Sequence, residues 1–391
     1  MQRVYLDHAA TTPTHPAVLE EMKPYFTSAY GNASSVHQLG RQARVAVEDA
    51  RERVATALGA ETSEIVFTSG GTEANNLALK GVLASQSGAD APAGLVTSAA
   101  EHEAILRPAE HLDGQGHPVT ILAPAAHGAV TPDQVADAID DTTALVSLMH
   151  TNNETAVRTD VPGVAEVCSA HDVLFHCDAV QAAGLYDLDV DALGVDLLSL
   201  SGHKFYGPKG VGVLFVRSGV ELGPLVEGGA QERERRGGTE NVPGVVGLAA
   251  ALERASEAAA DRRDHLRALQ RRLVAGLASA VPGDYVLNTP LDEAPTAPHV
   301  VNVAFPPPNG EPLDGEMLLL NLDMEGVCAS AGSACQSGAL EPSHVLEALG
   351  LERETAAAAL RFSMGAQTSE DEVDYALETL RTTLQRMESL G

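Results

Sequence analysis

One lysine stands where its amine could act as a nucleophile. Lys204 lies in Ser201-Gly202-His203-Lys204, directly after the apolar run 197–200, and it is one of only four lysines in a chain of 391 residues. An amine just beyond a buried strand is partly desolvated, which lowers its pKa and frees it to form a Schiff base with a carbonyl group. The segment alone also fits a surface lysine at the end of a strand.

A strand-to-helix turn offers a site for an anion. Residues 68–76 read Thr-Ser-Gly-Gly-Thr-Glu-Ala-Asn-Asn. The two glycines let the backbone approach a ligand, the helix N-terminus offers free N–H groups, and Thr72 adds a hydroxyl. An ordinary helix capped by Thr72 is the alternative. The motif is neither a Walker A loop nor GxGxxG, which disfavours a nucleotide.

Two further side chains follow candidate strands. Asp178 comes directly after the apolar run 173–177, where its carboxylate could pair with a protonated ring nitrogen, as pyridoxal phosphate requires. It could equally cap the next turn. His102, in Ala100-Glu101-His102-Glu103-Ala104, could stack on a ring or transfer a proton, although a lone histidine there is often structural.

A cysteine lies within a run of small residues. Cys335 is preceded by Gly332-Ser333-Ala334 and followed by Gln336-Ser337-Gly338. Such a segment can bury little, which favours an exposed, reactive thiol over a packing residue. An incidental thiol is the alternative. No CxxC motif or His/Cys cluster indicates a metal site.

The elements that must position these side chains alternate along the first two thirds of the chain. Helix-like segments at 72–83, 104–112, 131–139 and 161–171 separate several short apolar runs. This alternation predicts an α/β fold with a mostly parallel sheet, helices on both faces and a ligand site at the carboxyl ends of the strands. The seven candidate strands are residues 64–68, 94–98, 118–122, 144–149, 173–177, 197–200 and 211–216.

The last third predicts a smaller α+β domain. A long helical stretch at 243–281 is followed by a strand at 300–305, a helix at 314–322 and two closing helices near 343–349 and 369–387. The expected boundaries are 14–260 for the large domain, and 1–13 with 261–391 for the small domain that carries the cysteine segment.

Composition excludes several classes of partner. The net charge of −29 argues against nucleic acid and against anionic membrane surfaces. No apolar run approaches 18 residues and the N-terminus lacks an apolar signal region, so neither a membrane span nor secretion is expected. Four cysteines make no disulfide framework, which indicates a reducing cytoplasm. The acidic excess fits a high-salt interior or a generally acidic cytosolic protein.

Together the motifs resemble a cysteine desulfurase of the NifS/IscS type, a pyridoxal-phosphate enzyme of the class V aminotransferase group with fold type I. The resemblance covers nearly the whole chain. Its motifs are Tyr5-Leu6-Asp7-His8-Ala9-Ala10-Thr11-Thr12-Pro13, Gly31-Asn32-Ala33-Ser34-Ser35-Val36-His37, Ser69-Gly70-Gly71-Thr72-Glu73, Asn152-Asn153-Glu154, Asp178-Ala179-Val180-Gln181, Ser201-Gly202-His203-Lys204, Arg236-Gly237-Gly238-Thr239-Glu240-Asn241, Gly332-Ser333-Ala334-Cys335 and Leu360-Arg361-Phe362-Ser363.

The resemblance implies a role for each residue. Lys204 would bind pyridoxal 5'-phosphate and move the Cα proton, and Cys335 would take the substrate's sulfur as a persulfide. The remaining roles are cofactor ring contacts by His102, Asp178, Gln181 and Asn153, with Asn153 also near the substrate; phosphate contacts by Thr72, Ser201 and His203, with Thr239 from a second subunit; and a bidentate clamp on the substrate carboxylate by Arg361.

The implied reaction converts L-cysteine to L-alanine in a homodimer. The sulfur would pass to an acceptor protein, either an iron–sulfur scaffold or a tRNA-thiolation protein. The segment around Cys335 resembles the group with a long loop, which favours direct transfer. A selenocysteine lyase or another class V enzyme is the alternative, and a non-enzymatic sulfur-relay or scaffold-binding role is disfavoured because Lys204 and Asp178 are both present.

Overall fold

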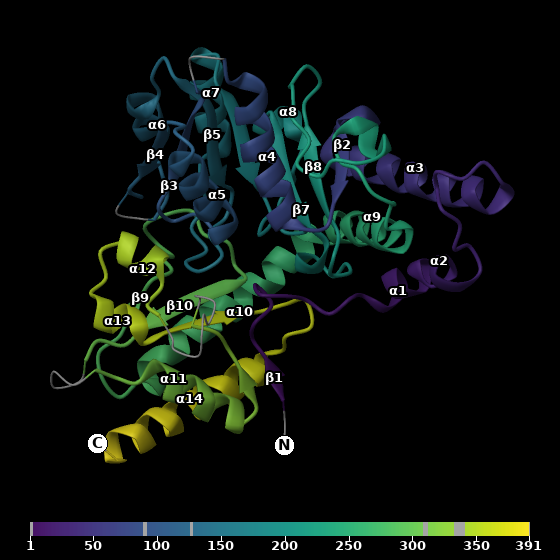
Figure 1. Ribbon diagram of the computed structural model, residues 1–391. Coiled ribbons are helices and arrows are strands. Elements are labelled where there is room, and N and C mark those ends of the chain that lie inside the picture. The colour runs from purple at the N-terminus through teal and green to yellow at the C-terminus, as the bar shows by residue number, and fades with distance from the viewer. Residues whose placement is uncertain (1–2, 89–91, 126–127, 308–311, 332–340, 391) are drawn as a thin grey trace.

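The computed structural model describes residues 3–88, 92–125, 128–307, 312–331 and 341–390. Figure 1 shows a larger α/β part built on one sheet and a smaller α+β part beneath it, with both ends of the chain at the smaller part. The strands are β1 (Val4–Tyr5), β2 (Ile65–Thr68), β3 (Gly94–Ser98), β4 (Val119–Leu122), β5 (Thr143–Met149), β6 (Leu174–Asp178), β7 (Leu197–Ser201), β8 (Gly212–Val216), β9 (Val286–Leu287), β10 (Val300–Ala304), β11 (Val327–Cys328) and β12 (Ala359–Ser363).

Helices connect these strands in nearly every interval of the large part. None among the described residues is long and apolar enough to span a membrane. The α-helices are α1 (Pro16–Met22), α2 (Pro24–Thr27), α3 (Gln38–Leu58), α4 (Gly71–Gln86), α5 (Glu103–Gly114), α6 (Pro132–Ala138), α7 (Val161–Ala170), α8 (Val190–Leu193), α9 (Val242–Glu257), α10 (Ala259–Ala280), α11 (Gly315–Met324), α12 (His344–Ala348), α13 (Arg353–Ala357) and α14 (Glu370–Leu390).

The large sheet has seven strands in the order β2-β8-β7-β6-β5-β3-β4. β8 runs antiparallel to both of its neighbours, and the other adjacent pairs are parallel. Each strand corresponds to one of the seven predicted from the sequence, with ends that shift by at most one residue. The predicted α/β fold with a mostly parallel seven-stranded sheet is confirmed.

Helices cover both faces of this sheet because its strands are apolar at consecutive positions. Leu197 packs in a cluster with residues of α4 and α5, whereas Leu198 packs on the opposite face with residues of α3, α7 and α9. Successive side chains of a strand point to opposite faces, so a strand that is buried on both sides reads as a continuous apolar run.

The smaller part is built around a three-stranded antiparallel sheet in the order β12-β10-β9. Helices α10, α11 and α14 pack in one apolar core with it. The N-terminal strand β1 joins this part by pairing with β11. The predicted helical stretch 243–281 is two helices, α9 in the core of the large part and α10 in that of the small part. The expected domain boundaries stay a prediction.

Candidate cofactor and substrate site

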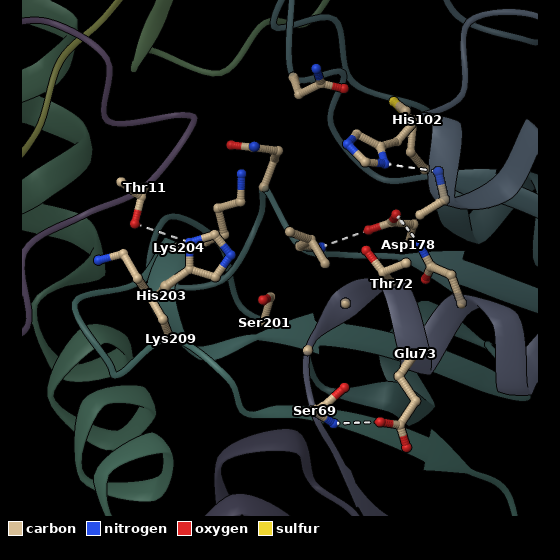
Figure 2. A pocket seen from close by; sticks show the side chains of 18 of the residues that line it. Thr11, Ser69, Thr72, Glu73, His102, Asp178, Ser201, His203, Lys204 and Lys209 are labelled. Carbon is tan, nitrogen blue, oxygen red and sulfur yellow. Dashed lines mark hydrogen bonds between the residues drawn. The ribbon is translucent and has the colours of Figure 1, made fainter. Parts of the chain in front are cut away.

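A cavity of about 490 Å³ opens at the carboxyl edge of the large sheet. The segments that follow β2, β3, β5, β6 and β7 line it, as expected for a parallel sheet, and Figure 2 shows their side chains converging. Eight of the residues predicted from the sequence line this cavity: Thr72, His102, Asn153, Asp178, Gln181, Ser201, His203 and Lys204.

A second cavity of about 560 Å³ meets the first. His102, Asn153 and Lys204 line both, so they form the boundary between the two. Arg361 lines only the second cavity. A ligand that lies across this boundary would contact Lys204 and Arg361 together.

Lys204 owes its position to the turn that follows β7. Ser201 ends the strand, and a single turn of 3-10 helix, Gly202–Lys204, brings the lysine to the cavity wall. Its Nζ donates to the carbonyl of Ala9 at 2.5 Å. Burial, with a smaller contribution from the positive charge of Arg361, lowers the pKa of Lys204 to about 8. A much larger share of the amine is therefore neutral and nucleophilic near neutral pH than in an ordinary lysine.

Asp178 is the last residue of β6, and its carboxylate is fixed by two donors. Oδ2 accepts from the side-chain amide of Asn75 at 2.7 Å, and Oδ1 accepts from the backbone of Val180 at 3.0 Å. Asn75 lies on α4, three residues after Thr72, and is buried. No role was predicted for it, although its spacing from Thr72 places the two on one helix face.

His102 is the N-cap of α5, and its Nδ1 accepts from the backbone N–H of Ala104 at 3.0 Å. Burial lowers the pKa of His102, and the positive charge of Lys204 lowers it further while Asp178 opposes the change. The neutral ring therefore carries its proton on Nε2. His102 can present an N–H group to a ligand in either cavity.

The start of α4 provides a cradle for an anion. Gly70 has φ +154°, and a Cβ added at Gly71 would lie 2.9 Å from Cγ2 of Val180 and 3.4 Å from Cβ of Ser201. The site therefore requires glycine at both positions, which leaves backbone N–H groups open beside the hydroxyls of Thr72 and Ser201.

His203 lines the same end of the site. Its Nδ1 lies 3.1 Å from the hydroxyl of Thr11, and burial together with the charges of Lys204 and Lys209 lowers its pKa to about 4. The neutral ring offers hydrogen bonds without adding positive charge.

Arg361 lies in β12, buried, and is already paired. Its Nη2 donates to Oδ1 of Asp7 at 2.9 Å, and its Nη1 donates to the backbone carbonyl of Asn153 at 3.0 Å. Its Nε is buried and has no hydrogen-bond partner among the described residues. The ion pair with Asp7 holds the guanidinium at the cavity, and each terminal nitrogen carries a second N–H that could donate to a bound carboxylate.

Thr239 and Cys335 are the two predicted site residues still to be placed. Thr239 is exposed and lines neither cavity. Cys335 lies outside the described residues, and Ser330 of the second cavity is the nearest described lining residue before it. No group of three or more His, Cys, Asp or Glu in the described part of the chain could hold a metal ion.

The fold and this site place the chain in a known class. It belongs to the aminotransferase class-V family, whose model matches residues 4–376. It is 45% identical to cysteine desulfurase IscS from Clostridium botulinum, in a match that covers 97% of this chain and 94% of that protein. It is 43% identical to cysteine desulfurase IscS from Methanosarcina thermophila, with 99% and 93% covered.

Solved structures are similar along almost the whole chain. A NifS-like protein superposes with a TM-score of 0.90 at 37% identity, covering 98% of this chain and all of that one. A structure of SspA in complex with cysteine superposes with a TM-score of 0.80 at 36% identity, covering 94% of this chain and all of that one.

Pyridoxal phosphate is the cofactor of this family, and the residues that line the first cavity fit it. The cavity combines an anion cradle at Gly70–Thr72, a fixed carboxylate at Asp178 and a lysine of lowered pKa. These groups match the cofactor's phosphate, its ring nitrogen and its aldehyde in turn.

Proposed function

We propose that this chain is a pyridoxal-phosphate-dependent cysteine desulfurase that converts L-cysteine to L-alanine and retains the sulfur as a persulfide on Cys335. One observation carries the proposal. Lys204, with its lowered pKa, lies at the boundary of two cavities, one lined by Asp178 and the other by Arg361. The names of the relatives that the chain resembles along almost its whole length support the same activity.

The bound cofactor supplies an electron sink that weakens the bonds at the substrate's Cα and Cβ. Asp178, fixed by Asn75 and Val180, keeps a proton on the cofactor's ring nitrogen, which the sink requires. Lys204 holds the cofactor and then moves the proton from the substrate's Cα, because its lowered pKa matches it to proton transfer near neutral pH. His102 lines both cavities and would assist this transfer through its Nε2.

Arg361 orients the substrate by its carboxylate. The guanidinium is buried, is held by Asp7 and by the carbonyl of Asn153, and lines the second cavity. A carboxylate that binds there gains a charge-assisted hydrogen bond in a poorly solvated place. This contact points the remaining atoms of the amino acid toward Lys204.

Sulfur transfer is the step assigned to Cys335. Its thiolate attacks the substrate's sulfur, the Cβ–S bond breaks, and the bonding electrons remain with the carbon skeleton, which gains a proton and leaves as alanine. The product is a Cys335 persulfide, so the two sulfur atoms and the electrons balance without an added oxidant. An acceptor protein then takes the outer sulfur for iron–sulfur cluster assembly or tRNA thiolation.

The working form is a homodimer in the cytoplasm. Thr239 is exposed and lines neither cavity of its own chain, which favours its use by a partner subunit. Large apolar side chains are exposed near the N-terminal helices, and a second copy of the chain would bury them. They are Leu19, Phe26, Tyr30, Val36 and Val45.

The test measures sulfide and alanine released from L-cysteine in the presence of a reductant. Cys335→Ser is expected to keep the cofactor's absorption band but release little sulfide, because Cys335 acts only after the substrate is bound. Cys328→Ser, which changes a thiol seven residues earlier, is the matched control and should release sulfide normally. Near-normal sulfide from the Cys335 variant would refute the mechanism. Turnover of selenocysteine without turnover of cysteine would support the lyase alternative.

A further inference from the structure

A histidine from the small part contacts a residue that lines the proposed cofactor site. His299 directly precedes β10, is 6% exposed, and its Nε2 lies 3.1 Å from Oε1 of Gln181. The amide nitrogen of Gln181 in turn lies 3.0 Å from the carbonyl of Ala9, the same oxygen that accepts from Lys204. The residues Gln181, Lys204 and His299 also share the lining of a small buried cavity of about 30 Å³.

Hydrogen-bond chemistry settles the direction of this chain of contacts. The Ala9 carbonyl can only accept, so Gln181 must turn its N–H₂ group toward Ala9 and its oxygen toward His299. The oxygen of Gln181 can only accept as well, so the proton of His299 must sit on Nε2. The opposite amide orientation would set two oxygen acceptors against each other at 3.0 Å.

We infer that His299 is a positioning residue of the site, which fixes the amide of Gln181 in one orientation and strengthens the hydrogen bond that Gln181 gives. The inference rests on the proposed function: Gln181, which the resemblance makes a contact of the cofactor ring, is taken as a donor to the ring's phenolic oxygen. Donors in series polarise one another, so an N–H that donates to Oε1 makes the N–H₂ end of the same amide a stronger donor.

The charges around His299 keep its ring neutral. Burial, with smaller contributions from Arg361, Lys204 and His8, lowers its pKa to about 3. Arg262 and Tyr206 also line the small cavity, and Asp7 faces Arg361 from the N-terminal segment. A neutral ring donates from Nε2 over the whole working pH range, so His299 acts through its hydrogen bond and not through a change of charge.

The test follows the absorption of the bound cofactor in the holoenzyme as pH is varied, without cysteine. A donor stabilises the deprotonated form of the oxygen to which it donates. His299→Leu and His299→Met, which remove the donor, are therefore expected to raise the midpoint of this titration by about half to one pH unit. His299→Gln retains an amide donor and should return the midpoint toward that of the unmodified chain.

Two comparisons separate this role from a general effect on folding. His8→Leu removes another buried imidazole from the same small cavity, and it should leave the midpoint unchanged because no described hydrogen bond joins His8 to Gln181. Gln181→Leu should shift the midpoint at least as far as His299→Leu, and the double variant should shift it no further than Gln181→Leu alone.

An unchanged midpoint in both donor-free variants would overturn the inference. So would a His299→Leu shift that persists in full in the Gln181→Leu background, or an equal shift in His8→Leu. The titration needs only bound cofactor. A failure to release sulfide from cysteine would count against the proposed function, but the titration of the cofactor's absorption could still be interpreted.

Discussion

Lys204 is expected to destabilise the apoprotein at neutral pH. Its pKa is lowered from 10.5 to about 8, mainly because burial removes water from the ammonium group. Each pKa unit corresponds to about 1.4 kcal/mol, so the charged amine costs the folded state up to about 3 kcal/mol of unfolding free energy. The amine borders a cavity, and water there reduces this figure, which makes it an upper bound.

The cost depends on pH in a direction that follows from proton counting. Between about pH 8 and pH 10.5 the unfolded chain binds a proton at Lys204 that the folded chain has released. Stability therefore rises with pH through this window, and the full cost is present below pH 8. In Lys204→Met the cost is absent at every pH. The stability advantage of the variant over the unmodified chain should shrink by up to about 3 kcal/mol from pH 7 to pH 10.5.

The assay is chemical denaturation of both apoproteins at several pH values, because the difference between them cancels every other titrating group. The loss of the hydrogen bond to Ala9 adds an offset that does not change with pH. Lys209→Met, which removes an exposed lysine five residues away, controls for the loss of a lysine as such. A stability difference between Lys204→Met and the unmodified chain that stays constant from pH 7 to pH 10.5 would refute the lowered pKa.

Three further outcomes are expected. Arg361→Ala should weaken cysteine binding by on the order of 2–5 kcal/mol while the cofactor band stays intact, and the spectral change on adding cysteine measures this affinity. Arg361→Lys should recover only part of the lost affinity. Unchanged affinity in the alanine variant would mean that the substrate carboxylate binds elsewhere. The melting temperature should rise from low to molar KCl, because a net charge of −29 repels itself less once the Debye length falls to ~3 Å; a flat or falling trend would exclude a high-salt adaptation. Light scattering at micromolar concentration should give the mass of two chains, and a fully active monomer would contradict the use of Thr239 across subunits.

The large sheet was predictable because its signal is local. Strands buried on both faces read as continuous apolar runs, and each of the seven lies within one residue of its predicted ends. Helix α3 was not among the predicted helices, although it has 21 residues. Its buried residues Ala43, Val47, Ala50, Val54 and Leu58 recur every three or four positions, so the helical periodicity was present in the sequence and this helix could also have been predicted.

The residues of the candidate site likewise fall into those that could be predicted from the sequence and those that could not. Residues that directly follow a strand, such as Asp178 and Lys204, could be placed at one edge of the sheet from the sequence. Their partners could not, because the contacts join distant segments. Asn75 and Asp178 are 103 positions apart, and Gln181 and His299 are 118 positions apart. Tertiary packing decides such pairs, within the large part for Asn75 and Asp178 and between the two parts for Gln181 and His299.

The N-terminal segment sets the order in which the protein can assemble. Ala9, whose carbonyl faces Lys204, is itself fixed by a hydrogen bond from its N–H to the hydroxyl of Ser363, 354 positions later. Strand β1 likewise can pair only after β11 has been made. During synthesis residues 4–9 thus cannot make these contacts until residues 327–363 have been made, and such long-range closure is slow. The large sheet is expected to fold first, and tight capture of the cofactor is expected only after Ser363 has been made.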